Sequence, residues 1–137
     1  MSNYTQTASL VAPSAAAQQL WATAGATIAA GQPVYVDAGT GLAQLGQATL
    51  AASAALQGVA GNSAAAGQQV QVVYSDPNFA HGLNAAGAGE DVWLSATAGA
   101  FCRYSDLVSG NFPVLVGITT SATKMVLRLT AGGVAKP

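Results

Sequence analysis

The sequence predicts an all-β protein folded as a compact barrel or sandwich and built from two related hairpin units. Three observations lead to this prediction. Apolar and polar residues alternate in several short runs, each run follows a glycine-containing turn, and the whole arrangement occurs twice along the chain. Short strands separated by tight turns are typical of sandwiches and barrels. We expect at most one or two short helices.

A turn followed by a strand occurs three times, at 28–36, 64–73 and 85–94. Each copy begins with small residues and a glycine, continues with one or two polar residues, and ends in an alternating strand. The glycine supplies a turn conformation with positive φ, which other residues adopt only at a cost. The alternating apolar pairs in the strands are Val34 with Val36, Val70 with Val72, and Val92 with Leu94. Each pair predicts one apolar stripe that faces the core.

The chain also contains a larger internal repeat. Its matched segments are 30–42 with 88–100, 56–60 with 115–119, and 70–74 with 125–129. The first two matches lie 58 and 59 positions apart. We therefore expect two related β units, at about 24–75 and 83–130, joined by a loop at 75–82.

Two segments have some helical character. The alanine-rich stretch 47–56 predicts at most a short helix, with a long loop as the alternative. Residues 105–110 predict a single helical turn, with Ser105 as its N-cap and Gly110 as its terminator.

The N-terminal segment differs from the rest of the chain. Residues 1–20 are small and polar apart from Tyr4, Leu10 and Val11, and we interpret them as an extended arm attached to a single β domain at 21–137. We expect this arm to lie along a neighbouring molecule and to become ordered there, for example by adding a strand. A frayed terminus is the alternative interpretation.

Charged residues are rare. Four basic and five acidic residues make up 7% of the chain, against about 25% in ordinary domains, and the formal net charge is −1. Low charge weakens the repulsion between copies, so the composition favours a subunit of an assembly over neutral drift in composition. The four basic residues form no cluster, which argues against nucleic acid as a partner.

The sequence predicts a protein without membrane spans or disulfides. No window approaches 18 uninterrupted apolar residues, so we expect no membrane partner. The first residues contain neither the basic nor the apolar region of a secretion signal, which fits synthesis in the cytosol. Cys102 is the lone cysteine, which leaves no intramolecular disulfide and no cysteine-based metal site, and its apolar surroundings predict burial.

The sequence offers little for catalysis. His81 is the single histidine, and between Ala80 and Gly82 it is expected to be solvated or packed rather than catalytic. Glu90 and Asp91 are the only adjacent carboxylates, and neighbours on a strand point to opposite faces. The glycine-rich tracts lack the lysine of a phosphate loop. We expect no enzyme activity, no cofactor, and no catalytic or metal-ligating residue.

The aromatic residues divide into two groups. Four are expected in the core: Trp21, Tyr35, Trp93 and Phe112. Tyr4 in the arm and Phe79 in the predicted loop are expected at an interface, because their surroundings are not strands. Together with Leu10, Val11 and His81 they form the set of candidate partner-contacting residues.

Several of these segments, taken together, resemble the capsid cement (head decoration) proteins of tailed bacteriophages. The resemblance is carried by residues 29–37, 58–70, 92–99 and 105–107, and it covers about 22–130. These are turn-and-strand motifs of small residues. They include no catalytic residue.

The resemblance implies a β-tulip or β-barrel fold that sits on the outer surface of the virion capsid, after synthesis in the host cytoplasm. It implies that the protein bridges neighbouring major capsid subunits and stabilises the shell as a homo-oligomer, with a homotrimer favoured and a dimer possible. It also implies an arm that docks on the capsid. A second interpretation is a virion-surface binding module, such as a fibre or host-carbohydrate-binding domain. That interpretation requires exposed aromatic platforms, for which Tyr4 and Phe79 are the candidates.

Overall fold

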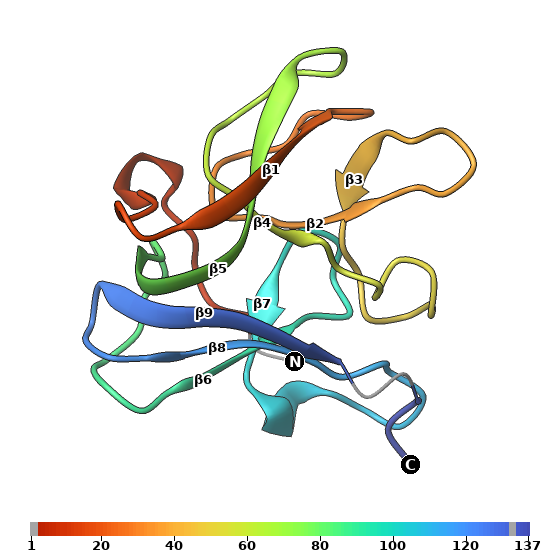
Figure 1. The fold of residues 1–137 in the computed structure, drawn as a ribbon. Coiled ribbons are helices and arrows are strands. Elements are labelled where there is room, and N and C mark those ends of the chain that lie inside the picture. Colours follow the sequence, from red (N-terminus) through yellow and green to blue (C-terminus); the bar gives the residue numbers. More distant parts are fainter. Residues whose placement is uncertain (1–2, 132–133) are drawn as a thin grey trace.

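The computed structural model describes residues 3–131 and 134–137, which form a strongly curled half-barrel sheet of nine antiparallel strands (Figure 1). The predicted all-β fold is confirmed, since the described residues contain two 3-10 turns and no α-helix. The 3-10 turns are η1 (Ala8–Leu10) and η2 (Tyr104–Asp106), and the strands are β1 (Gln18–Thr23), β2 (Pro33–Val36), β3 (Ala43–Leu45), β4 (Gly58–Ala60), β5 (Gln69–Ala80), β6 (Asp91–Leu94), β7 (Phe101–Cys102), β8 (Val114–Thr119) and β9 (Lys124–Ala131).

The order of the strands has an internal symmetry. The sheet reads β3-β2-β4-β5-β9-β8-β6-β7, and β1 pairs separately with β5. The first unit therefore contributes β3-β2-β4-β5, and the second contributes its counterparts β7-β6-β8-β9 in the reverse direction. The two units meet where β5 pairs with β9. Figure 1 shows β6, β8 and β9 grouped on one side of this junction.

The strand registers match between the two units. Val34 of β2 pairs with Gly58 of β4, and in the second unit Val92 of β6 pairs with Gly117 of β8. Val34 and its counterpart Val92 are 58 positions apart, and Gly58 and its counterpart Gly117 are 59 positions apart, as in the sequence repeat. The two related hairpin units therefore share the register of β2 with β4 and of β6 with β8.

The last strand of each unit corrects the predicted alignment. Matching 70–74 with 125–129 is two positions out, because the structure pairs Val59 with Val73 and its counterpart Ile118 with Val126. The chain takes eight residues (61–68) to turn from β4 into β5 but only four (120–123) from β8 into β9. The shorter second turn changes the spacing for every residue after it.

The three sequence copies of the turn share one conformation. Gly31, Gly67 and Gly89 have φ of 91°, 88° and 86°, as predicted. In each copy the residue after the glycine turns its side-chain oxygen back to a backbone N–H three positions earlier; the acceptor and donor residues are Gln32 and Ala29, Gln68 and Ala65, and Glu90 and Gly87. This contact closes the turn and satisfies a backbone donor that the turn leaves unpaired.

The predicted loop at 75–82 is wrong, because most of it belongs to β5. This strand continues to Ala80, and its ladder with β9 shifts register between Asp76 and Phe79. The shift accommodates Pro77, which has no backbone N–H to donate. The carboxylate of Asp76 is buried at this bulge and accepts the Asn78 N–H at 3.0 Å. The proline therefore marks a bulge in a long strand and not its end.

The N-terminal segment lies on the chain's own sheet. Isolated bridges join Asn3 to Cys102, Gln6 to Leu83, and Ala12 to Ala80. The Ser14 N–H and hydroxyl both donate to the buried Asp76 carboxylate. Much of the backbone of the described part of this arm is therefore hydrogen-bonded within the chain, and contact of the arm with a neighbouring molecule stays a prediction. Residues 18–20 already belong to β1.

The two segments with helical character form turns. Residues 47–56 contain turns without a helix. The single turn at Tyr104–Asp106 is present, but Arg103 is its N-cap and Ser105 lies inside it. No described helix is long and apolar enough to cross a membrane.

Cys102 lies in the core as predicted, and burial raises the pKa of its thiol to about 11.

Gly58 and Gly117 occupy equivalent places at the closest approach of neighbouring strands. A Cβ on Gly58 would lie 2.4 Å from the Val73 carbonyl oxygen, and one on Gly117 would lie 2.3 Å from the Val126 carbonyl oxygen. Real Cβ atoms do not approach backbone oxygens so closely, so any larger residue must push the strands apart.

We expect Gly58→Ala and Gly117→Ala each to lower the free energy of unfolding by about 1–3 kcal/mol, because the backbone must move to accept the methyl group. Gly87→Ala is the matched control, since its Cβ would meet nothing within 4 Å, and it should change stability by less than about 0.5 kcal/mol. Urea denaturation measures all three. Equal stability of the Gly117 and Gly87 variants would refute the steric explanation.

Candidate functional site

Four of the five candidate partner-contacting residues lie in one region of the molecule. Phe79 and His81 flank Ala80 at the end of β5, and a methyl group of Val11 lies against the glycines at 31 and 82. Tyr4 belongs to the same buried cluster as Phe79. The structure thus brings Tyr4 and Val11 into the region of Phe79 and His81, which follow them by 68 to 77 positions in the sequence.

Most of this set is inaccessible. Tyr4, Phe79 and His81 are buried, with His81 exposed by only 2%, and Val11 is half-buried. Leu10 is the accessible member, with 64% of its surface exposed. The expectation that Tyr4 and Phe79 lie at an interface is wrong, because both fill the protein's own core. They cannot serve as aromatic platforms for a sugar either.

A shallow apolar hollow lies beside Leu10. We call it the Leu10 hollow, and it is lined by Leu10, Ala80, Gly82, Leu83, Ala122, Thr123 and Lys124. The N-terminal segment, the end of β5 and the β8–β9 turn all contribute to it. Lys124 supplies the positive charge among the lining residues.

His81 is buried between Ala80 and Gly82, two residues that line this hollow. Its Nδ1 accepts the Leu83 N–H at 2.9 Å, so the proton of the neutral ring is on Nε2. Nε2 is buried, and no hydrogen bond of standard geometry reaches it from the described residues, although the Ser121 backbone lies close enough to affect the ring. Burial lowers the pKa of His81 below its ordinary value of 6.5, and this outweighs the opposing effects of the Ser121 backbone and the Glu90 charge.

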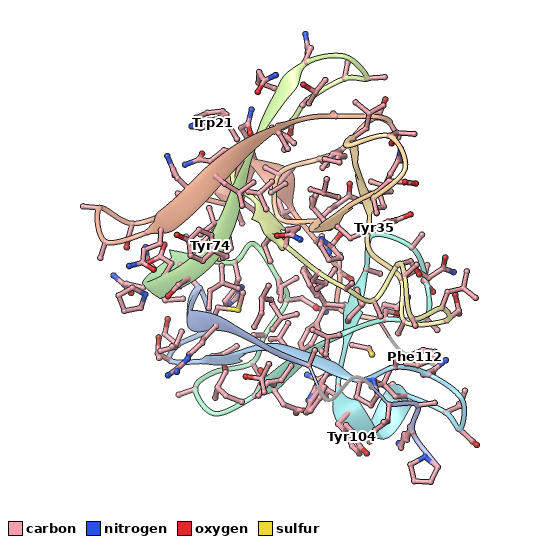
Figure 2. The ribbon with its side chains drawn as sticks, turned by 45° about the vertical axis from the view of Figure 1, so that its right-hand side comes forward. Trp21, Tyr35, Tyr74, Tyr104 and Phe112 are labelled. Carbon is pink, nitrogen blue, oxygen red and sulfur yellow. The ribbon has the colours of Figure 1, made fainter. Side chains whose placement is uncertain are left out.

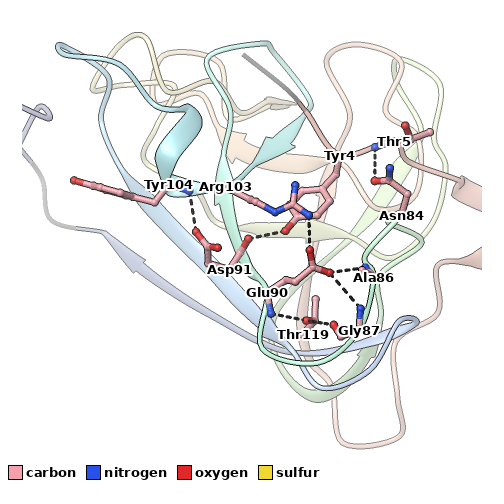
Figure 3. A network of polar contacts seen from close by, with 10 residues as sticks. All are labelled: Tyr4, Thr5, Asn84, Ala86, Gly87, Glu90, Asp91, Arg103, Tyr104 and Thr119. Carbon is pink, nitrogen blue, oxygen red and sulfur yellow. Dashed lines mark hydrogen bonds and ion pairs between the residues drawn. The ribbon is translucent and has the colours of Figure 1, made fainter.

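A polar cluster fastens the N-terminal segment to the second β unit (Figure 3). The Arg103 guanidinium lies over the Tyr4 ring, 4.4 Å from its centroid, and forms an ion pair with Glu90. The Tyr4 hydroxyl donates to the Asp91 carbonyl oxygen at 2.8 Å. Burial raises the pKa of Tyr4 to about 12 despite the adjacent Arg103, and the hydrogen bond from Arg103 lowers the pKa of Glu90. These contacts are structural, since the ring is enclosed.

The same cluster is extended by hydrogen bonds to backbone groups. Glu90 also accepts the N–H groups of Ala86 and Gly87. Asp91 accepts the Tyr104 N–H at 2.8 Å, and the Asn84 side chain accepts the Thr5 N–H at 2.8 Å. The carboxylates of Glu90 and Asp91 are therefore used to hold the chain's own backbone.

Exposed apolar side chains are spread over the described surface. The large ones are Leu10, Trp21, Leu50, Tyr74, Tyr104, Val108, Ile118, Val126 and Val134. Figure 2 shows the labelled aromatics distributed from one end of the molecule to the other. In the described residues no group of three or more His, Cys, Asp and Glu could hold a metal ion.

Trp21 is an exposed residue that sequence reasoning placed in the core. It is 58% exposed, whereas Leu20 and Ala22 on either side of it pack against a buried cluster. A signal for this was available, because residues two apart on a strand share a face and Trp21 alternates with the polar Gln19 and Thr23. Tyr35, Trp93 and Phe112 are half-buried rather than fully in the core.

No protein-family model matches the sequence, and no curated protein matches it.

We expect Tyr4→Ala to lower the free energy of unfolding by about 3 kcal/mol or more, because it empties part of the central core and removes the hydrogen bond to Asp91. Tyr74→Ala is the control, since Tyr74 is 41% exposed and its loss should cost about 1 kcal/mol or less. Denaturant titration measures both. If the two variants unfold at the same denaturant concentration, the N-terminal segment contributes nothing to the core.

We expect the folded protein to lose stability as the pH falls from about 8 to 5. The pKa of His81 is depressed on folding, so below its unfolded value of 6.5 the unfolded chain binds the proton more tightly. The slope is at most about 1.4 kcal/mol per pH unit for one proton, and it ends below the folded pKa. Thermal unfolding at several pH values measures the effect.

His81→Asn supplies the control for this pH dependence. Its side-chain oxygen can still accept the Leu83 N–H, but it does not titrate. Its stability should be level between pH 8 and 5. If His81→Asn kept the wild-type slope, the pH dependence of stability would have to come from another titratable group.

Proposed function

We propose that this protein decorates the outer surface of a bacteriophage capsid and stabilises it by bridging neighbouring major capsid subunits. The segments that resemble head decoration proteins support this function. The structural observation that carries it is the distribution of exposed apolar side chains over several parts of the curled sheet. A protein that bridges subunits needs contacts on more than one side.

The scarcity of charge supports this function. A charged group that enters an interface loses its hydration, and the interaction with its new partner often fails to compensate. Six of the nine charged residues already bond within the chain, namely Asp37, Asp76, Glu90, Asp91, Arg103 and Lys136. Much of the remaining surface is formed by alanine, glutamine, serine and threonine, which can be covered at low cost.

The Leu10 hollow is the proposed contact with the major capsid protein. It presents an exposed leucine next to small residues and one cation, Lys124. Such a contact is small and weak by itself. On an icosahedral shell it is multiplied by symmetry, and many modest contacts together produce strong attachment.

We expect the purified protein to bind expanded heads of its phage, to bind compact precursor shells much less, and to raise the temperature at which expanded heads release their genome. Sedimentation of heads with bound protein and a thermal release assay measure these effects. Heads whose stability is the same with and without the protein would refute the proposed function.

Leu10→Asp tests the contact itself. A carboxylate at the centre of an apolar contact should weaken head binding about tenfold or more, which corresponds to about 1.4 kcal/mol. Leu50→Asp is the matched control, because Leu50 is also 64% exposed but lies in the 47–56 segment, outside the hollow. Equal binding by both variants would remove the Leu10 hollow from the interface.

A further inference from the structure

The outer edge of β1 is an unpaired strand edge. Residues Gln18–Thr23 pair with β5, and no other described residue pairs with them. In an antiparallel ladder, half of the backbone N–H and C=O groups of an edge strand point away from its partner and stay available to another strand.

The other two ends of the sheet are closed by the chain itself. At the β3 end, the Gly25 N–H donates to the Ala43 carbonyl oxygen at 2.8 Å. At the β7 end, the Tyr4 N–H donates to the Phe101 carbonyl oxygen at 2.9 Å, and Asn3 bridges Cys102. Unlike these two ends, the outer edge of β1 has no backbone partner among the described residues.

The β1 edge lacks the features that usually prevent edge-to-edge association. Native edges are commonly protected by charges, prolines or bulges. The first 36 residues contain no charged side chain, and neither does the part of β5 that pairs with β1, at 69–75. The register is regular from Gln19 to Thr23, with its single irregularity at Gln18. A second β1 would meet no repulsion here.

The outward face of β1 carries a bulky apolar group among neutral amides. Trp21 lies between Gln19 and Thr23, whose side chains bond across the strands to Gln71 and Gln69. Figure 2 shows Trp21 at the periphery of the molecule. Exposed tryptophans are enriched at protein interfaces, where they bury a large area at little entropic cost.

We infer that β1 pairs with β1 of a second copy of this chain, antiparallel and about a two-fold axis, to join two sheets into one. The charge pattern selects this occupant, because an uncharged strand is compatible with itself. The inference does not depend on binding to capsids.

The burial pattern restricts the register of this pairing. The outward residues must face outward residues of the copy, and the half-buried Leu20 and Ala22 must stay on the inner face. The axis therefore passes through a residue position. Centred on Trp21, it sets the two indoles opposite each other; centred on Leu20, it sets Trp21 opposite Gln19 of the copy.

Size-exclusion chromatography with light scattering, over a dilution series, tests the inference. Six-residue strands bury less than the about 1,200–2,000 Å² of a stable interface, so we expect a dimer that dissociates at micromolar concentrations. Gln19→Lys and Trp21→Lys place two like charges near the axis, and each should raise the dissociation constant at least tenfold. Leu50→Lys, at an equally exposed site on another segment, should leave it unchanged.

Three outcomes overturn the inference. The first is a wild-type chain that stays monomeric at the highest concentration. The second is a trimer, which two-fold edge pairing cannot produce. The third is a Gln19→Lys variant that still forms dimers. Gln19 is exposed on the surface, so this variant is expected to fold even if Trp21→Lys does not. A monomer whose Trp21 fluorescence responds to soluble glycans would instead assign this face to sugar binding.

Discussion

The pairing of β5 with β9 is the interaction on which the rest of the structure depends. Each β unit consists of short strands, and small sheets of this kind are not stable alone in water. Across the junction, Ser75 pairs with Arg128 and Phe79 pairs with Met125, so that the largest core cluster draws side chains from both units. β5 also pairs with β4 and β1, and its length of 12 residues lets one strand serve all three neighbours. The two units are therefore parts of one core.

The N-terminal segment completes this core. Tyr4 packs with Phe79 and Val92, which lie in different units, and Arg103 covers the outer side of its ring. Ser14 satisfies the buried carboxylate at the β5 bulge, where a charge without partners would cost several kcal/mol. The same segment also closes the edge of β7. A stretch that resembles a free arm in the sequence thus has three roles within the fold. It fills the core, it hydrogen-bonds a buried carboxylate, and it pairs with an edge strand.

The sequence predicts the repeated part of this structure well and the unique part poorly. The positive-φ glycines at 31 and 89 and the alternating strands after them are local features, and local features can be recognised without tertiary knowledge. The position of Phe79 depends on a bulge that accommodates Pro77, and the burial of Tyr4 depends on pairing with residues about 100 positions away. Trp21 lies between these cases, because alternation alone places it on the polar face of its strand.

The distribution of charge links the fold to the proposed assembly. The charged residues gather in the second half of the chain, where Arg103 and Glu90 hold the N-terminal segment, whereas the first 36 residues are neutral. A neutral surface neither repels a copy of itself nor requires ions to be stripped of water when it is covered. The open edge of β1 and the exposed Leu10 both belong to this neutral part. The uncharged part of the chain, which a partner can cover at low cost, is thus the part in which the fold leaves a strand edge and apolar side chains accessible.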